Sequence, residues 1–357
     1  MKMMKKNLIL GIVIIVLIVT IGLYFQKTKK PLEETASIRI GAAIALTGYG
    51  ASFGQSELNA IDLLKDKYPT LKFYVEDNKS APNSGIMAVK KLIEIHNVDI
   101  VYCDLTTVAN AVISITNEHE KVLIASVYLN NLLERSPYAI RNLPRGVDEA
   151  KLLLDNLYKE SPSAKKIVAI ASNDEFGRTS LEDFKMVSMS YDLVITFEDL
   201  IPDNEKQIKS FAKKIVVKSP DVVYAASLMP SLGLLIKELR LANYGGEIIT
   251  TDAFAFPYIQ DRAGPYAKNT LYIDFPSTSA LKDFEKKYRE KYSLEISSTA
   301  VLCYDGLSLI IDASLQSGKK PKDIVNGLDG MQYDGLYGNV IIDKREIIYP
   351  IIVKKAK

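Results

Sequence analysis

The stretch "IRIGAAIALTGYGASFGQSELNAIDLL", residues 38–64, contains the pattern that decides the fold. It begins with an apolar, strand-like run, Ile38–Leu46, and ends with a helix-like run, Ser56–Leu64. Three glycines lie in the connection between them: Gly48, Gly50 and Gly54. A glycine-rich turn that opens a helix can bind an anion, because the first backbone N–H groups of a helix have no partner within it. The acidic pair Glu76-Asp77 follows near the end of the next strand, so the turn fits a dinucleotide-binding enzyme or another protein that needs a glycine-rich rim.

The alternation of short apolar runs with amphipathic runs continues along the chain. Strands are expected at Ile38–Leu46, Leu71–Glu76, Asp99–Cys103, Val122–Ala125, Ile167–Ala171, Leu193–Phe197, Val222–Ala226, Glu247–Thr250 and Thr270–Ile273. Helices are expected between them at Ser56–Lys67, Gly85–Ile95, Val108–Glu118, Asp148–Tyr158, Thr179–Met189, Lys206–Val217 and Ser231–Ala242. Short strands that alternate with longer helices indicate parallel sheets covered by helices on both faces.

The pattern changes in the C-terminal part of the chain. Two consecutive helices are expected at Ala280–Tyr292 and Thr299–Leu315, followed by a terminal pair of strands at Tyr333–Asp343 and Ile347–Val353. A chain of 357 residues exceeds the size of most single cores, which rarely grow past about 250–300 residues. Short connections such as Tyr138–Gly146 and Leu271–Ser279 separate the two β/α sets. The pattern therefore predicts two Rossmann-like α/β lobes with parallel sheets, joined by several chain crossings.

The N-terminal segment is apolar enough to interact with a membrane. Leu8–Phe25 is continuously apolar except for Gly11, Thr20 and Gly22, and lysines flank it. Its length is near the lower limit for crossing a bilayer of about 30 Å. The sequence that follows it has neither an A-x-A cleavage site nor a cysteine for lipid attachment. We therefore expect residues 1–30 to form an uncleaved anchor with the body outside the cytoplasm; a cleaved signal peptide is the alternative.

Charge and side-chain inventory argue against several classes of function. Six lysines and no acidic residue lie in the first thirty residues, so the rest of the chain has a net charge of −4 and no basic run that would favour nucleic acid as a partner. The chain has two histidines, His96 and His119, and no G-x-S-x-G, C-x-x-C or G-x-x-x-x-G-K-[ST] motif. We expect no enzyme activity, metal or cofactor. Cys103 and Cys303 are expected to be buried free thiols, with a disulfide between them as the alternative.

Five motifs together resemble one family. After "IRIGAAIALTGYGASFGQSELNAIDLL" come "EDNKSAPNSGIMAVKKLI" (Glu76–Ile93), "NDEFGRTSLEDF" (Asn173–Phe184), "VVYAASLMPSLGLLIKELR" (Val222–Arg240) and "AVLCYDGLSLIIDA" (Ala300–Ala313). In this order and spacing they resemble the type I periplasmic binding proteins, in particular the branched-chain amino-acid-binding proteins of ABC importers. The resemblance extends from Ile38 to nearly the C-terminus. It implies one lobe formed by residues 37–143 and 276–331, and a second formed by residues 144–275 and 332–357.

The resemblance also implies a ligand site between the lobes. The turn at Thr47–Gly54 resembles the rim of a binding cleft rather than a phosphate loop, with Tyr49 and Phe53 near the ligand. Thr106 and Thr107 at a helix start would bind the carboxylate of an amino acid, and Tyr128 and Asn130 fall where the family has further contacts. Asp252 falls at the position of the acid that binds the ammonium group. Phe176 and Leu228 stand where relatives have tyrosines, which makes this wall more apolar. Helix caps at Thr106, Thr107 and Asp252, and a simple βα turn at the glycines, are the alternatives.

These observations predict an extracytoplasmic solute-binding protein that captures a small ligand for an ABC importer permease. An apolar amino acid is the expected ligand, and a carboxylate or amide that lacks the amine is the alternative. A membrane-tethered sensing subunit of a signalling partner is a second possible function. A nicotinamide-dependent oxidoreductase is the rival from the enzyme class.

Overall fold

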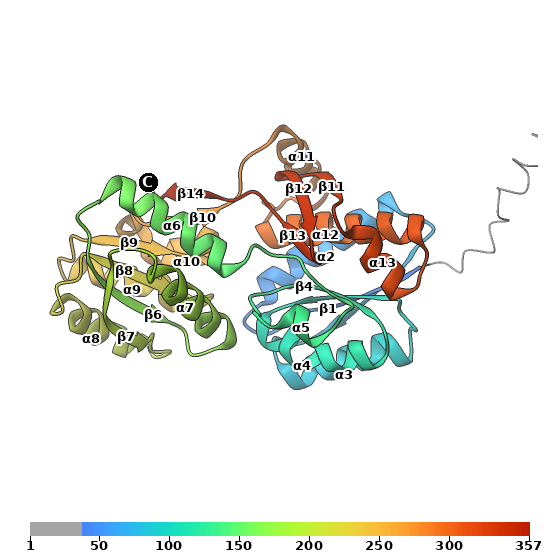
Figure 1. Ribbon diagram of the computed structural model, residues 1–357, viewed down its shortest axis with the longest axis horizontal. Helices are drawn as coiled ribbons and strands as arrows, with labels where there is room; N and C mark the ends of the chain where they lie inside the picture. The colour runs from blue at the N-terminus through green and yellow to red at the C-terminus, as the bar shows by residue number, and fades with distance from the viewer. Residues whose placement is uncertain (1–37) are drawn as a thin grey trace, which may run out of the picture. The chain divides into compact units, whose positions relative to one another are not determined.

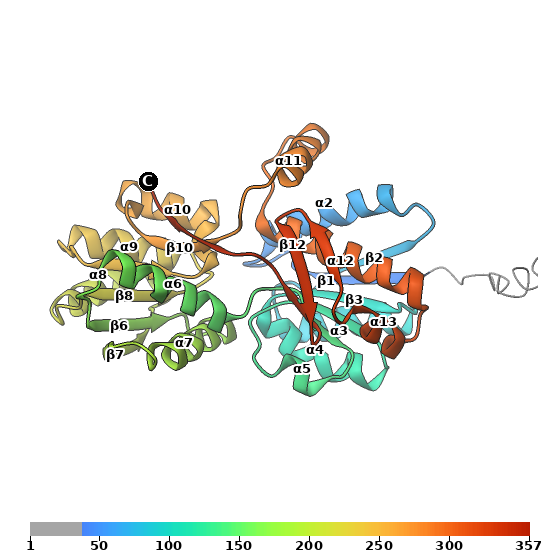
Figure 2. The same ribbon diagram turned by 45° about the horizontal axis from the view of Figure 1, so that its top comes forward.

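Two β-sheets, each covered by helices on both faces, form residues 38–357, which are the residues that the computed structural model describes (Figures 1 and 2). The expected anchor, Leu8–Phe25, lies outside them. The first sheet has the strand order β11-β12-β13-β5-β4-β3-β1-β2. Its strands are β1 (Arg39–Ile44), β2 (Lys72–Asp77), β3 (Ile100–Asp104), β4 (Val122–Ser126), β5 (Ala139–Arg141), β11 (Gln332–Gly335), β12 (Gly338–Asp343) and β13 (Glu346–Ile348).

The second sheet has the order β14-β10-β9-β8-β6-β7. Its strands are β6 (Lys166–Ala171), β7 (Val194–Leu200), β8 (Val222–Ala226), β9 (Glu247–Thr250), β10 (Leu271–Asp274) and β14 (Ile352–Lys355). In this sheet the neighbouring strands β7, β6, β8, β9 and β10 are all parallel. In the first sheet the neighbouring strands β2, β1, β3, β4, β5 and β13 are all parallel. Antiparallel pairs occur only at one edge of each sheet, where β11, β12 and β14 join. The predicted class, two lobes with parallel sheets, is confirmed, with these antiparallel edges as a refinement.

The helices of the first lobe are α2 (Ala51–Lys67), α3 (Pro82–Glu94), α4 (Thr106–Glu118), α5 (Leu132–Arg135), α11 (Ser279–Tyr292), α12 (Ser298–Ser317) and α13 (Pro321–Leu328). Helix α2 packs on α12, and α3 packs on α4. Helix α2 connects β1 to β2, and α3 connects β2 back past β1 to β3, so the two connections run in opposite directions across the sheet. Because each connection is right-handed, these two pairs of helices lie on opposite faces. Among the described residues, α12 is the helix long and apolar enough to span a membrane, but most of it is buried in this lobe, as in a core helix.

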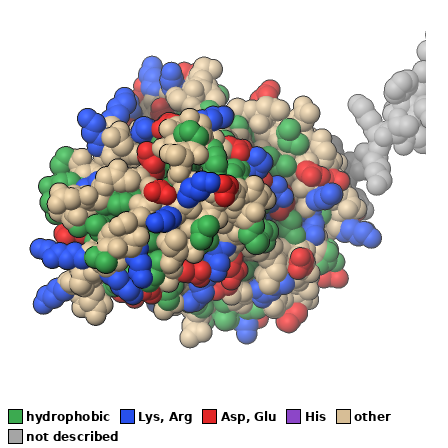
Figure 3. All heavy atoms as spheres, turned by 60° about the vertical axis from the view of Figure 1, so that its left-hand side comes forward, with side chains coloured by type: hydrophobic (Ala, Val, Ile, Leu, Met, Phe, Trp, Pro, Cys, Tyr) green, Lys and Arg blue, Asp and Glu red, His purple; other side chains and the backbone are tan. Residues whose placement is uncertain are grey.

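The helices of the second lobe follow the same rule. They are α6 (Gly146–Glu160), α7 (Glu175–Ser188), α8 (Glu205–Val216), α9 (Ser231–Leu241) and α10 (Pro257–Ala263), with 3-10 turns η1 (Asp252–Ala255) and η2 (Gly264–Ala267). Helices α6 and α7 contact each other, and α9 contacts both α8 and α10. On the face shown in Figure 3, basic and acidic side chains are interspersed, so this face has no continuous patch of one charge.

The C-terminal residues correct the predicted lobe boundary. Residues 332–357 were expected in the second lobe, but β11, β12 and β13 join the first sheet, and β14 joins the second. The single strand expected over Tyr333–Asp343 is a hairpin that turns between Gly335 and Gly338. The strand expected over Ile347–Val353 is divided between the two sheets. The chain therefore crosses between lobes three times, at residues 142–145, 275–278 and 349–351, which confirms the expected multiple crossings (Figure 1).

Long-range polar contacts explain why β13 joins the first lobe. Glu346 pairs with Arg141 of β5 in the sheet and accepts a hydrogen bond from its Nε at 3.3 Å. The neighbouring Arg345 donates to the backbone carbonyls of Leu133 and Ser136. Local sequence patterns do not contain such contacts, because the partners lie about 200 residues apart.

Candidate functional site

A small cavity of about 60 Å³ lies between the lobes, at the carboxyl ends of the parallel strands. Open α/β sheets commonly bind ligands at this edge. The first lobe lines it with Phe53, Glu57, Asp104, Leu105, Thr106, Ser126, Tyr128, Ser298, Thr299 and Leu302. Leu143, from the first crossing, completes this side. The second lobe contributes Phe176, Leu228, Asp252 and Phe256. Six of the nine predicted site residues therefore line the cavity: Phe53, Thr106, Tyr128, Phe176, Leu228 and Asp252.

The second-lobe side of the cavity contains a buried acidic group. The Tyr128 hydroxyl donates to Asp252 Oδ1 at 3.0 Å and also contacts Glu149 Oε1. A hydroxyl has one proton, so both contacts are hydrogen bonds only when one of the two carboxyl groups is protonated. Burial raises the pKa of Asp252 to about 6, and burial followed by the charge of Asp252 raises the pKa of Glu149 well above its ordinary value. The alternative that Asp252 is a helix cap is wrong, because Thr251 is the capping residue of η1 and its Oγ1 accepts from the Ala253 N–H at 3.3 Å.

A second acidic group lies on the first-lobe side. Asp104, at the end of β3, accepts from the Ala45 N–H at 3.0 Å and from Asn78 Nδ2 at 2.6 Å, which occupies both of its oxygens. Burial raises the pKa of Asp104 to about 6. Glu57, in α2, accepts from the Tyr102 hydroxyl at 2.8 Å through Oε1. Its carboxyl group also hydrogen-bonds to that of Asp104, which favours the proton on Glu57. Burial and then the charge of Asp104 raise the pKa of Glu57 well above its ordinary value.

The start of α4 differs from the predicted carboxylate site. Leu105 is the N-cap, with φ of 60°, so neither threonine caps the helix through its side chain. Thr106 lines the cavity, and its Oγ1 accepts a hydrogen bond from the Tyr128 N–H at 3.1 Å, which leaves its own hydroxyl proton free to donate. Thr107, the threonine favoured from the sequence, does not line the cavity. Tyr49 also lies outside it, with 46% of its surface exposed.

Aromatic contacts close the cavity between the lobes. The rings of Phe53 and Phe256 have centroids 4.6 Å apart, and the perpendicular rings of Tyr128 and Phe176 have centroids 4.9 Å apart. Each pair joins one lobe to the other. The predicted apolar character of the wall at Phe176 and Leu228 is consistent with their place in the lining.

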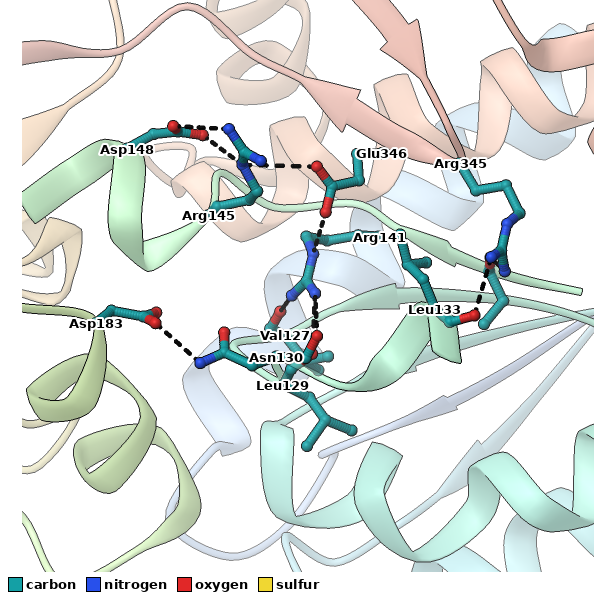
Figure 4. A network of polar contacts seen from close by, with 11 residues as sticks. Val127, Leu129, Asn130, Leu133, Arg141, Arg145, Asp148, Asp183, Arg345 and Glu346 are labelled. Carbon is teal, nitrogen blue, oxygen red and sulfur yellow. Dashed lines mark hydrogen bonds and ion pairs between the residues drawn. The ribbon is translucent and has the colours of Figure 1, made fainter. Parts of the chain in front are cut away.

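Asn130 does not line the cavity; it connects the lobes beside it. Its Nδ2 donates to Asp183 Oδ1 of α7 at 2.8 Å (Figure 4). The guanidinium of Arg141 lies behind the same loop and donates to the carbonyls of Val127 at 3.2 Å and Leu129 at 2.9 Å. Asn130 therefore joins the lobes beside the cavity, and its contact with a ligand stays a prediction.

The glycine-rich turn is already occupied by polar partners from the next loop. Asp77 Oδ1 accepts from the N–H groups of Leu46 at 3.0 Å and Thr47 at 3.2 Å, and Ser80 Oγ accepts from the Gly50 N–H at 3.0 Å. Helix α2 begins at Ala51, earlier than expected, so Gly54 lies inside it. A Cβ at Gly54 would lie 2.1 Å from the Ala45 carbonyl oxygen. This glycine therefore allows α2 to pack closely on β1.

Sequence reasoning missed Glu57, Asp104, Leu105, Ser126, Leu143, Phe256, Ser298, Thr299 and Leu302. A signal for Glu57 was present, because it falls on the same helical face as Phe53, Ile61 and Leu64, all of them buried. An acid on an apolar helix face requires a buried partner or a functional role. Cys103 and Cys303 are buried free thiols, as predicted. Within residues 38–357, no cluster of three or more metal-ligating side chains could hold a metal ion.

Comparisons with known proteins bear on this geometry. A family model described as "Periplasmic binding protein" matches residues 37–347. A Leu/Ile/Val-binding protein homolog 2 from Brucella abortus (strain 2308) is 22% identical over 345 residues, with 91% of this chain and 88% of the relative covered. The predicted resemblance is thereby confirmed.

Two solved structures have the same fold. A solute-binding protein of an ABC transporter from Rhodopseudomonas palustris BisB5, in complex with 3,4-dihydroxybenzoic acid, is 20% identical with a TM-score of 0.80 and covers 90% of this chain and 93% of its own. The branched-chain amino acid transporter substrate-binding protein LivJ from Streptococcus pneumoniae, in complex with isoleucine, is 19% identical with a TM-score of 0.74 and covers 90% and 100%. One fold thus accommodates an aromatic acid and an aliphatic amino acid in different proteins.

Proposed function

Because this chain belongs to the periplasmic binding protein family, we propose that it captures a small solute between its two lobes and delivers it to the permease of an ABC importer. The observation that carries this proposal is the cavity that both lobes line, with the half-buried Asp252 on one side and the buried Glu57 on the other. A carboxyl group withdrawn from water is costly to ionise, so the raised pKa of Asp252 in the cavity lining favours a partner that arrives from outside.

The ligand is small, mostly apolar and carries an amino group. Phe53, Leu228 and Phe256 provide apolar walls, and Asp252 provides the acceptor for an ammonium or amine. An apolar amino acid, the ligand expected from the sequence, has both features. The ligands of the two solved relatives, an aromatic acid and an aliphatic amino acid, differ in chemistry and do not indicate the ligand of this chain. The proposed ligand class therefore rests on the residues that line the cavity.

Two alternative functions, a sensing subunit and an oxidoreductase, can be distinguished from solute delivery. A sensing subunit would close over a solute in the same way and differ only in its membrane partner; co-purification of a permease and ATPase, or of a kinase or cyclase, separates the two. An oxidoreductase is less well supported, because Asp77 and Ser80 already occupy the N–H groups of the glycine-rich turn, where a dinucleotide phosphate would bind.

The proposed function also implies a location for the protein outside the cytoplasm. The family acts outside the cytoplasm, and the apolar run Leu8–Phe25 would anchor the body to the membrane. Mass spectrometry of membrane-extracted protein should find the N-terminal peptide. A mature chain that begins near residues 27–32 would show cleavage instead.

A thermal-shift screen of the detergent-solubilised full chain tests solute capture. The screen should contain amino acids, small amines, amides, carboxylates and a nicotinamide dinucleotide. A solute that binds only the folded state raises the melting temperature in proportion to the logarithm of its concentration. We expect a shift with at least one amine-bearing aliphatic solute and none with the dinucleotide. A shift with the dinucleotide alone would favour the enzyme alternative.

A further inference from the structure

Glu149 lies behind the cavity, where the second lobe meets Tyr128 of the first lobe. It is in the first turn of α6, directly after the first crossing, and is not part of the cavity lining. The residue is 1% exposed, and its Oε1 contacts the Tyr128 hydroxyl. We infer that Glu149 is a positioning residue of the solute site, which takes up a proton when the lobes close and thereby joins Tyr128 to the second lobe. This inference rests on the proposed function and adds a residue to its site.

The hydrogen bonds of Tyr128 require this additional proton. The Tyr128 hydroxyl donates to Asp252 Oδ1 at 3.0 Å and has no second proton for Glu149 Oε1. An ionised Glu149 would therefore place lone pairs against lone pairs in a buried position. A protonated Glu149 removes this conflict, because its own O–H donates to the Tyr128 oxygen while Tyr128 donates to Asp252. One hydroxyl of the first lobe is then bonded to two carboxyl groups of the second.

The surroundings place the proton on Glu149 rather than on Asp252. Burial, followed by the charge of Asp252, raises the pKa of Glu149 well above its ordinary value, whereas the pKa of Asp252 rises to about 6. Asp252 is only half-buried and lines the cavity, where a solute can reach it. Glu149 can therefore hold the proton while Asp252 stays ionised for a cationic group of the solute.

The other ionisable groups that face this pair do not supply a positive charge to it. They are Asp183 of α7, Tyr224 of β8, Tyr258 of α10 and Asp274 of β10. The two acids disfavour further negative charge, and burial raises the pKa of both tyrosines, so these stay neutral. Arg141 and Arg145 act on Asp183, and each also pairs with Glu346.

Opening of the lobes weakens proton binding by Glu149. Tyr128 moves away with the first lobe and water reaches the carboxyl group, so the burial that raises its pKa is lost. The closed state therefore binds the proton more tightly than the open state. Low pH favours closure without a solute, and this closure is lost as the pH rises. At higher pH, a solute that contacts both walls is needed to close the lobes.

A distance between spin labels on the two lobes tests the inference in the detergent-solubilised full chain. Helices α4 and α7 belong to different lobes and contact each other, so labels at Ser114→Cys and Arg178→Cys, both exposed, report closure. Cys103 and Cys303 are buried. Without solute, we expect a shorter distance at about pH 5 than at about pH 9. The same distance at both pH values would overturn the inference, and the thermal-shift screen would still decide separately whether the chain captures a solute.

Two variants then assign the proton to Glu149. In Glu149→Gln the amide N–H₂ donates to Tyr128 at every pH, so the distance should be short at both pH values. Tyr128→Phe keeps the ring and loses the hydroxyl, so the distance should be long at both. The exposed control Glu182→Gln, also in α7, should retain the pH dependence of the parent chain. A folded Glu149→Gln protein with the pH dependence of the parent chain would overturn the inference, because the proton would then bind elsewhere.

Discussion

At the scale of single residues, the cavity lining includes carboxyl groups whose surroundings disfavour their charged form. Burial raises the pKa of Asp104 and Asp252 to about 6, and Tyr128 shares its hydroxyl between Asp252 and Glu149. A cationic ligand group would replace lost water as the partner of such a carboxylate. Affinity should therefore depend strongly on charge and weakly on the rim residues, such as Tyr49.

Asp252→Asn should weaken binding of an amine-bearing ligand at least about tenfold. A charge-assisted hydrogen bond contributes roughly 1.5–3 kcal/mol in net terms, and 1.4 kcal/mol corresponds to one decade in affinity. Asparagine keeps the shape and can still accept from the Tyr128 hydroxyl. Calorimetric titration with the best amine measures the loss, and Asp203→Asn serves as the exposed control. Unchanged affinity in a folded Asp252→Asn protein would remove Asp252 from the site.

Asp305 allows a test of pH dependence away from the cavity. This residue of α12 is 2% exposed, its Oδ2 accepts from the Leu336 N–H at 2.7 Å, and its Oδ1 has no partner. Burial raises its pKa to about 7, although the Leu336 N–H and Lys67 partly oppose this. A carboxyl group whose pKa is raised on folding stabilises the protein below its unfolded pKa of about 3.9, and this stabilisation is lost as the pH rises toward 7.

Asp305→Asn should remove this pH dependence, because an amide keeps an acceptor for Leu336 and does not ionise. One pKa unit corresponds to roughly 1.4 kcal/mol. The difference in free energy of unfolding, variant minus wild type, should therefore increase by up to about 4 kcal/mol from pH 4 to pH 8. Urea denaturation at several pH values measures the difference. Parallel curves for the two proteins would show that Asp305 does not titrate in this range.

At the scale of elements, the sequence predicted long and central elements well and short ones poorly. Helix α8, with its buried face of Ile208, Phe211, Ala212 and Ile215, follows the 3.6-residue period that sequence analysis detects. Strand β5 has three residues and contains no usable period. Helix α4 begins at Thr106 because Leu105 adopts a φ of 60°, which no local pattern predicts. The helix therefore begins two residues before the expected Val108, and Thr106, not Thr107, lines the cavity.

The contact between α2 and β1 can be tested at Gly54. Gly54→Ala would place a Cβ 2.1 Å from the Ala45 carbonyl, so the helix would have to move and would carry Phe53 and Glu57 with it. We expect a loss of at least about 1–3 kcal/mol in the free energy of unfolding, together with weaker ligand binding. The control is Gly245→Ala, where a Cβ would meet no heavy atom within 4 Å. Equal unfolding midpoints for the two variants would contradict the close packing.

At the scale of the whole described body, the sequence predicted two lobes and their several crossings, because the β/α alternation repeats and no long linker interrupts it. It did not predict where 332–348 belong, since that depends on Arg141 and Glu346, which meet only after folding. Cavity residues at strand ends, such as Asp252, were accessible to sequence reasoning. Glu57 was accessible too, through its place on the apolar face of α2, whereas Asp104 was not, because a charge at the end of a strand is usually solvated.

The last prediction concerns closure of the lobes over the ligand. In this structure the lobes touch through Asn130 and Asp183 and through Phe53 and Phe256, beside the cavity. A ligand that contacts both walls should favour this closed arrangement, because only there can it reach Asp252 and Glu57 together. Small-angle scattering should show a smaller radius of gyration at saturation than without ligand. No change would indicate a body that is closed at all times.

Asn130→Ala separates closure from ligand contact. Asn130 lies outside the cavity, so its loss should leave the order of preference among ligands intact and lower the population of the closed state. Apparent affinity falls in proportion to that population, and one hydrogen bond of about 0.5–1.5 kcal/mol corresponds to roughly a two- to tenfold loss for every ligand. The matched control is Asn83→Ala, on an exposed position of α3, which should change neither affinity nor the radius of gyration. A change of ligand preference in Asn130→Ala would instead mean that the side chain contacts the ligand, as the sequence first predicted.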